Sequence, residues 1–156
     1  MSTNEFTIPS PPEGQDLAKT SMRFEVTPIP VADFDRAKAF YQQLGWRLDI
    51  DLPISEKLRA VQFTPPGSPA SIQFGPVGAA PLQRLIVVVE NIEAARAELV
   101  DRGIEVSEIW HGAPGQPPQP GRDPEGGSYT SQASFTDPDG NGWVLQEVTE
   151  RIPGRI

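Results

Sequence analysis

The residues able to do chemistry are few in this chain, and His111 is the first of them. The 156 residues include one histidine and no cysteine. A single imidazole excludes a site that needs two from one subunit. The lack of thiols excludes disulfides, zinc–thiolate sites, iron–sulfur clusters and cysteine nucleophiles. His111 ends the strand-like run SEIWH and opens a loop, so it is a candidate general base. The alternative is a solvated loop histidine.

Arg84 is the second candidate, because it stands directly before the apolar run LIVVV. A guanidinium presents a planar fork of N–H donors that matches a carboxylate, which makes Arg84 a candidate anion-binding residue. The alternative is a strand-end arginine whose charged head reaches solvent. No dinucleotide-binding fingerprint, phosphate-binding loop or serine-hydrolase motif accompanies these residues.

The charge balance excludes two classes of partner. The chain has 13 basic and 21 acidic residues, a net charge of −8, which opposes non-specific binding to nucleic acid and to anionic membranes. No apolar run approaches the roughly 20 residues of a membrane-spanning helix, and no signal-peptide pattern opens the chain. We therefore expect a soluble, cytoplasmic protein with one domain.

An internal repeat organises the chain. Two helical patterns each follow a capping residue, Asp33 in the first and Asn91 in the second. When the sequence is shifted by 58 positions, residues 31–45 coincide with residues 89–103 in their caps, acidic residues, alanines and terminal glycines. Strand-like runs precede and follow each helix, at residues 24–31, 46–52, 85–89 and 104–110.

Each half then closes in a hairpin-like pair. Residues 61–74 contain a Pro/Gly turn, and residues 133–148 turn at DPDGN, where Asp137 and Asp139 are explained by turn geometry. Each half therefore has the pattern β-α-β-β-β. Two such units in one domain predict an α+β fold with two curved sheets facing each other.

Three segments fall outside the repeat. Residues 1–20 are rich in proline and lack periodicity, so we expect a flexible N-terminal extension. Residues 112–127 are mostly Gly and Pro, and a loop of this length is either a functional lid or disordered. Residues 151–156 form a short C-terminal tail.

Three motifs of the repeat, residues 30–46, 87–106 and 135–148, resemble the vicinal oxygen chelate superfamily. This superfamily includes glyoxalase I, extradiol dioxygenases, fosfomycin-modifying enzymes and bleomycin-binding proteins. The resemblance implies two paired βαβββ modules that form a cup-shaped, half-open barrel around a cavity. The single domain then spans residues 21–150, with modules at about 22–76 and 82–149.

Metal-dependent members of that superfamily hold a divalent cation with four side chains in the cavity. The resemblance assigns these positions to Val26, Arg84, Val144 and either Ser71 or Gln73. Valine has no donor atom, and the positive charge of arginine repels a cation, so we expect no metal and no cofactor. Glu25 and Glu147 lie next to these positions and face the other way, although a one-residue shift in register would bring them in.

The predicted cavity face also carries polar and aromatic side chains. Gln73 and Gln146 occupy matching places in the two halves and are candidate polar anchors for a ligand. Their alternative is a hydrogen bond to each other or exposure at a sheet edge. Trp110 and Tyr129 flank the Gly/Pro-rich loop and are further candidate ligand contacts, whereas Trp46 and Trp143 are more typical of a core.

These observations favour a metal-independent protein of the glyoxalase and bleomycin-resistance type, which binds a small anionic or aromatic molecule in the cup. The resemblance to small single-domain relatives implies a homodimer. The alternative is a lyase, isomerase or dioxygenase. Such an enzyme would be either metal-free, with His111 and Arg84 as catalytic groups, or metal-dependent with ligands at other positions. A weaker alternative is an interaction protein whose partner surface is the extension and the loop.

Overall fold

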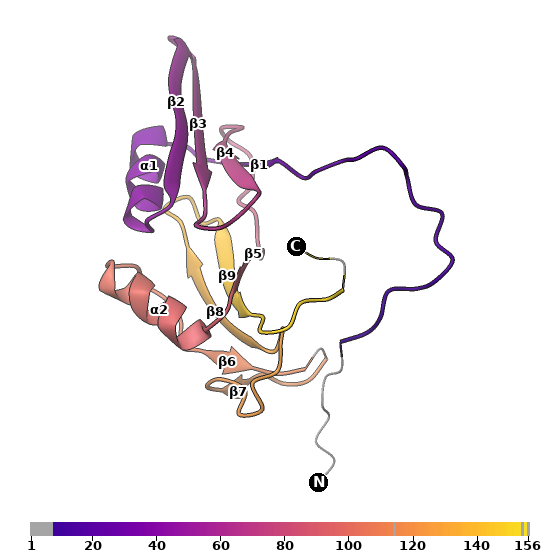
Figure 1. The fold of residues 1–156 in the computed structure, drawn as a ribbon. Helices are drawn as coiled ribbons and strands as arrows, with labels where there is room; N and C mark the ends of the chain where they lie inside the picture. Colours follow the sequence, from indigo (N-terminus) through magenta and orange to yellow (C-terminus); the bar gives the residue numbers. More distant parts are fainter. Residues whose placement is uncertain (1–7, 114, 154, 156) are drawn as a thin grey trace.

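The computed structural model describes residues 8–113, 115–153 and 155. The first half of the chain forms a four-stranded sheet, the first sheet, with one helix (Figure 1). Its elements are β1 (Val26–Ile29), α1 (Phe34–Gln43), β2 (Arg47–Ser55), β3 (Leu58–Thr64) and β4 (Ser71–Phe74). The strand order is β1-β4-β3-β2, with β1 parallel to β4 and the other neighbours antiparallel.

The second half forms the second sheet, with strand order β5-β9-β8-β6-β7. Its elements are β5 (Leu85–Val89), α2 (Ile92–Asp101), β6 (Trp110–His111), β7 (Gln119–Pro120), β8 (Ser131–Thr136) and β9 (Gly142–Glu147). The parallel pair of this sheet is β5 with β9. Two mixed sheets that do not close into a barrel confirm the predicted α+β class and its half-open arrangement.

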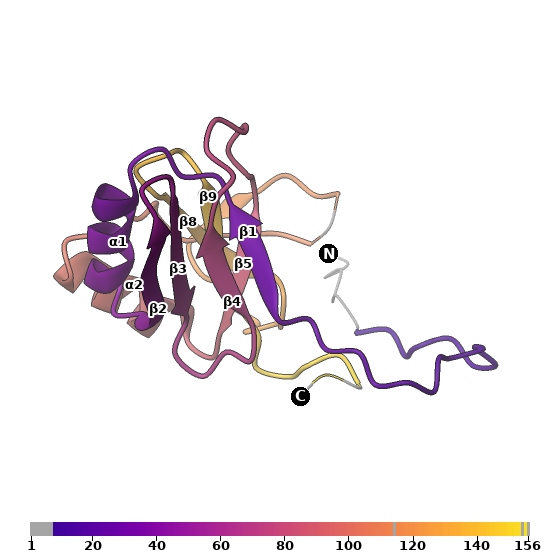
Figure 2. The same ribbon diagram turned by 90° about the horizontal axis from the view of Figure 1, so that it is seen from above.

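The two helices begin where the sequence predicts them. The Asp33 carboxylate accepts a hydrogen bond from the Arg36 amide, and the Asn91 side-chain oxygen accepts one from the Ala94 amide, both at 3.0 Å. These contacts satisfy amides that have no partner within the first helical turn. The bounds of the two helices are displaced by 58 residues, as the repeat requires. Both helices lie along one flank of the molecule (Figures 1 and 2).

Each sheet has one face in the core and one face that no helix covers, which we call its helix-free face. On β3, Val61 and Phe63 are buried in the core, so Gln62 between them lies on the helix-free face. On β9, Trp143 and Leu145 belong to the core. Val144, which is also buried, and the half-buried Gln146 therefore lie on the helix-free face of the second sheet.

A buried hydrogen-bond network joins the two halves. The Tyr41 hydroxyl donates to Asp137 Oδ2 at 2.8 Å and accepts from Trp143 Nε1 at 3.0 Å. Asn141 Nδ2 donates to Asp137 Oδ2 and to the Pro30 carbonyl, both at 2.8 Å. Burial, together with the Asp137 charge, raises the pKa of Tyr41 far above its ordinary value. The phenol therefore remains a donor, and α1 is fixed to the β8–β9 turn.

Trp46 and Trp143 lie in the aromatic core, as we expected for large aromatic side chains in strands. The rings of Trp46 and Trp143 meet edge to face, with centroids 4.9 Å apart, and both side chains are buried. Tyr41 packs among Trp46, Phe63 and Phe74 of its own module. It also meets Trp143 of the second module, so the core contains rings from both modules.

Residues 104–109 are not a strand, contrary to the sequence-based expectation. Arg96 on α2 donates to the carbonyls of Ser107 and Val106, which takes these acceptors away from a β-ladder. The strand is limited to β6, and β6 pairs with β7, a strand that the Gly/Pro-rich sequence did not predict.

The second part of the Gly/Pro-rich loop is anchored on the helical side of the second sheet. Arg122 Nη2 lies 2.9 Å from Glu147 Oε1, and the Glu147 side chain is 1% exposed. Glu147 Oε2 also accepts the amide of Ile92 at the start of α2, at 2.9 Å. The hydrogen bond to Glu147, together with the negative charge of Glu147, raises the pKa of Arg122. The anchor therefore lies away from the helix-free face.

The N-terminal segment extends from the body of the molecule (Figure 2). Residues 9–25 are exposed, including Leu17, Met22 and Phe24. Residues 1–7 of the predicted flexible extension lie outside the described residues, and the mobility of the extension stays a prediction. Within the part of the chain that the structure describes, no helix is long and apolar enough to cross a bilayer.

Candidate functional site

Three candidate residues come together on the helix-free face of the first sheet. Val26 on β1 lies beside Ser71 on β4, and two residues further along the strands Pro28 lies beside Gln73. Gln73 in turn lies opposite Gln62 of β3. The predicted cavity face of the first module is therefore a continuous surface of the sheet, with two amide side chains at its middle.

A hydrogen-bonded row crosses this same face. The Thr64 hydroxyl lies within hydrogen-bonding distance of Asp49 Oδ2 and is 2.7 Å from Ser71 Oγ. Arg47 contributes a guanidinium N–H to the other oxygen of Asp49. The contacts of Arg47 and Thr64 hold the pKa of Asp49 below its usual value. The row joins three strands and ends at Ser71.

Sequence reasoning missed Asp49 and Thr64. Thr64 is two residues after Gln62 on the same strand, so the hairpin pattern could have predicted that both side chains lie on one face. The position of the Asp49 side chain could not be predicted in this way. A register shift in β2 between Leu48 and Ile50 leaves Asp49 without an opposite residue. A β-bulge of this kind redirects a side chain, and nothing in the local sequence predicts it.

The second sheet carries Val144 and Gln146 on its helix-free face. Val144 lies between Ile86 of β5 and Ser134 of β8, and Gln146 lies beside Val88 of β5. Gln146 Nε2 donates to the Tyr129 carbonyl at 3.3 Å. The hydrogen-bond partner of Gln146 is therefore a backbone carbonyl of its own module, in the turn before β8, and not Gln73.

Arg84 and Tyr129 share an unusual backbone conformation. Their φ angles are +59° and +67°, and they are the non-glycine residues with positive φ in the described chain. Arg84 is exposed, and its side chain forms no hydrogen bond or ion pair with another described residue. The Tyr129 hydroxyl accepts the amide of Ile152 at 3.1 Å, so its ring bridges the loop end and the C-terminal segment.

His111 and Trp110 point to opposite faces of the second sheet. Trp110 pairs with Gln132, which lies opposite Gln146, so Trp110 belongs to the helix-free face. His111 pairs with the buried Ser131 and lies on the other face. His111 Nδ1 contacts the Gly121 carbonyl at 2.7 Å, which requires a proton on Nδ1. The structure does not bring His111 to the face that carries Gln146.

The side chains at the positions that the resemblance assigns to metal ligands do not fit a divalent cation. Val26 and Val144 offer no lone pair, and Arg84 brings a positive charge. Glu147, the nearest alternative ligand, is bound to Arg122 and Ile92 on the other face. In residues 8–113, 115–153 and 155, no group of three or more His, Asp or Glu side chains is arranged to hold a metal.

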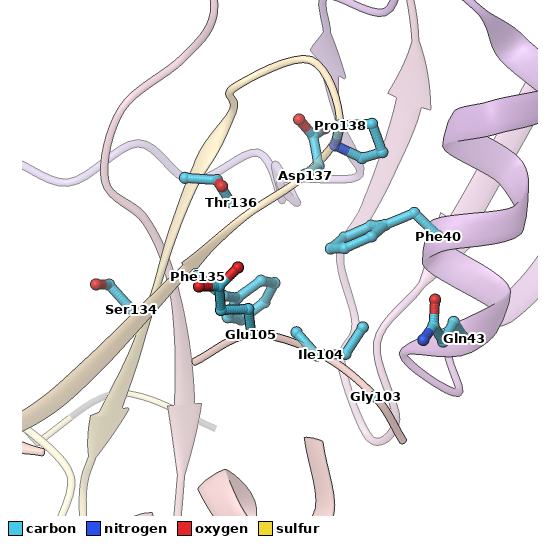
Figure 3. A pocket seen from close by; sticks show the side chains of 10 residues that line it. All are labelled: Phe40, Gln43, Gly103, Ile104, Glu105, Ser134, Phe135, Thr136, Asp137 and Pro138. Carbon is cyan, nitrogen blue, oxygen red and sulfur yellow. The ribbon is translucent and has the colours of Figure 1, made fainter. Parts of the chain in front are cut away.

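A hollow of about 450 Å³ lies elsewhere, between the end of α1 and the start of the β8–β9 turn (Figure 3). Phe40, Ile104 and Phe135 provide apolar side chains, and Gln43 and Glu105 are among the polar residues that line it. Asp137 also contributes, but its two oxygens are already engaged by Tyr41, Asn141 and turn amides. None of the candidate residues lines this hollow.

Solved structures with this fold include two from Streptomyces sp. CB03234. TnmS3, described as an antibiotic binding protein, is 27% identical, with a TM-score of 0.61 over 84% of this chain and 99% of that chain. A glyoxalase/bleomycin resistance protein is also 27% identical, with a TM-score of 0.60 over 80% of this chain and 100% of that chain. A lactoylglutathione lyase from Agrobacterium tumefaciens, 18% identical, has a TM-score of 0.57 over 83% of this chain and 96% of that chain, and shares the fold.

Among curated proteins, none matches this chain. The profile of one family matches residues 23–145, which include both modules from before β1 into β9. The profile, the duplicated βαβββ modules and the solved structures all agree. The chain therefore belongs to the Glyoxalase/Bleomycin resistance protein/Dioxygenase superfamily.

Proposed function

We propose that this chain binds a small organic molecule, without a metal, on the helix-free faces of its two modules. The residues at three positions carry the proposal: Val26, Arg84 and Val144 stand where the resemblance places the cation ligands of metal-dependent relatives. Two aliphatic side chains and one guanidinium suit an apolar molecule with an anionic group. The 27% identical TnmS3, described as an antibiotic binding protein, supports a small organic ligand.

The backbone at Arg84 supports a role for its side chain. A left-handed conformation costs a non-glycine residue about 1–2 kcal/mol, which glycine avoids. Arg84 has φ +59°, yet its side chain gains no hydrogen bond or ion pair within the described chain. Strain of this kind persists at binding sites where a particular side chain is needed. The guanidinium then supplies the positive charge that a cation supplies in metal-dependent relatives.

The assembly in this proposal is a homodimer. The helix-free faces expose large apolar side chains, namely Ile50, Leu52, Ile54, Leu58, Ile86 and Val88. Strands β1 and β5 also stand at the edges of their sheets, where they can accept a further strand. A second copy would cover these side chains and enclose the ligand-binding face.

Calorimetric titration with 2-naphthoate and its neutral analogue 2-naphthamide tests the proposal. We expect the wild-type protein to prefer 2-naphthoate, and Arg84→Met to lose about 10- to 150-fold in affinity for it, the value of a charge-assisted hydrogen bond. Arg84→Lys should recover part of the loss, because an ammonium lacks the planar fork. Arg155→Met, which removes an exposed arginine of the tail, is the matched control and should bind as wild type does.

Two results would contradict the proposal. Equal affinities of wild type, Arg84→Met and Arg84→Lys for 2-naphthoate would show that Arg84 points to solvent. Elemental analysis that finds one equivalent of zinc, manganese, nickel or iron in protein purified without chelator and then dialysed would show a metal site.

A further inference from the structure

The row of Asp49, Thr64 and Ser71 has a definite direction of hydrogen bonding. The contacts of Arg47 and Thr64 keep Asp49 ionised at neutral pH, so its carboxylate can only accept. The Thr64 hydroxyl has one proton, and its contact with Asp49 uses that proton. In the contact of 2.7 Å between the two hydroxyl oxygens, Ser71 must therefore be the donor and Thr64 the acceptor.

Because Ser71 donates its proton to Thr64, Ser71 Oγ can only accept a hydrogen bond from a ligand. Its single proton is committed to Thr64, and its remaining lone pairs have no other partner in the described chain. Thr64 is 3% exposed, whereas Ser71 is half-buried beside Val26 on the helix-free face. The end of the row that a ligand can reach is therefore an acceptor, and the Asp49 charge strengthens it through the chain of hydroxyls.

A nucleophilic role for Ser71 does not agree with this arrangement. A serine nucleophile must lose its proton to a base in the transition state. Here the only carboxylate at the end of the row is Asp49, whose pKa is held below that of an ordinary aspartate, so it is a weak proton acceptor. His111 lies in the other sheet, on the face away from Gln146. The row is suited to recognition.

We infer that Ser71 recognises a hydrogen-bond donor on the bound molecule, a phenol, alcohol or N–H group, with its acceptor role fixed by Thr64 and Asp49. The inference rests on the proposed function, because it names a second chemical feature of the same ligand. The proposed ligand would place its anionic group at Arg84 and its hydrogen-bond donor at Ser71. The bulge of β2 is then the structural device that brings Asp49 to the row.

The test compares 2-naphthol, which donates through its hydroxyl, with 2-methoxynaphthalene, which cannot donate. We expect wild-type protein to bind 2-naphthol about 10-fold more tightly, the lower value for a hydrogen bond to a charge-assisted acceptor. Ser71→Ala should abolish this preference and reduce the ratio of the two affinities to about one. Ser55→Ala removes a hydroxyl from an exposed position of the same sheet and should keep the wild-type ratio.

The variant Thr64→Val should change the ratio of the affinities for 2-naphthol and 2-methoxynaphthalene in a way that a loss of side-chain packing would not produce. Valine has the shape of threonine but cannot accept the Ser71 proton. The serine hydroxyl can then turn and donate to the ether oxygen of 2-methoxynaphthalene. We expect the ratio to fall to one or to reverse, with Ser71 still present.

The outcomes separate this inference from the proposed function. If 2-naphthoate binds through Arg84 but 2-naphthol and 2-methoxynaphthalene bind wild type equally, or neither of them binds, the inference about Ser71 is wrong and the proposed function stands. A preference for 2-naphthol that survives in Ser71→Ala also overturns it. If no naphthalene compound binds, both the inference and the proposed function fail.

Discussion

Arg84 combines two properties at one residue, an unfavourable backbone and an unpartnered charge. Its φ of +59° lies in the region that glycine occupies freely. Its guanidinium is exposed and forms no interaction with the described residues that would offset the strain. In the proposed function, a ligand from outside the chain supplies the partner that the Arg84 guanidinium lacks.

Arg84→Gly should therefore separate stability from binding. Glycine relieves the left-handed strain at this position, so the free energy of unfolding should stay equal or rise by up to about 1 kcal/mol. The same change should weaken 2-naphthoate binding about 10- to 150-fold. Urea denaturation and calorimetry on one protein preparation measure both quantities. A marked loss of stability would mean that the arginine packs against the fold, contrary to its role here.

At the scale of the elements, the link between α1 and the β8–β9 turn holds the two modules together. The Tyr41 hydroxyl donates a hydrogen bond to Asp137 and accepts one from Trp143, and all three residues are buried. The modules thus share a polar network within a common aromatic core. The relative position of the two helix-free faces depends on this contact.

Tyr41→Phe should lower the free energy of unfolding by about 1–3 kcal/mol, because a buried carboxylate and a buried indole N–H each lose a partner. Urea denaturation measures the change. Tyr129→Phe is the matched control, since the Tyr129 hydroxyl serves one backbone amide near the C-terminus and its loss should cost less than about 1 kcal/mol. Equal stability of Tyr41→Phe and wild type would show that the network does not join the modules energetically.

The sequence predicted the elements better than the site, for a physical reason. The caps Asp33 and Asn91, the 58-residue repeat and the DPDGN turn are local signals, and they gave the helices and the hairpins. Features set by contacts distant in sequence were not predictable. Arg96 takes the carbonyls that would have made residues 104–109 a strand, and the β2 bulge places Asp49 beside Thr64. On β9 the alternation of side chains, which is itself local, agrees with the prediction that Trp143 and Leu145 point away from the face of Val144, since both belong to the core.

At the scale of the whole molecule, the helix-free faces leave apolar surface exposed. Their large apolar side chains are exposed, and Leu52 and Ile54 on β2 are more than half exposed. A net charge of −8 makes copies of the chain repel one another but does not remove the free-energy cost of this exposed surface. A stable pairing of two proteins buries about 800 Å² on each partner. The β2–β3 hairpin and β5 together offer an apolar surface for such a contact.

We therefore expect a dimer by light scattering at micromolar concentration, and a monomer when Leu52→Lys and Ile86→Lys are combined. Both changes place a charge on a helix-free face that the second copy must cover, and burying an unpaired ammonium costs several kcal/mol. Val100→Lys is the control, because Val100 is also an exposed aliphatic residue but lies on α2, away from these faces, so this variant should remain dimeric. In the proposed dimer the second copy encloses the ligand, so the double variant should lose 2-naphthoate affinity together with its dimeric mass. An unchanged circular dichroism spectrum would show that the fold is intact. A wild-type protein of monomer mass that still binds 2-naphthoate would contradict the dimer and confine the binding site to one chain.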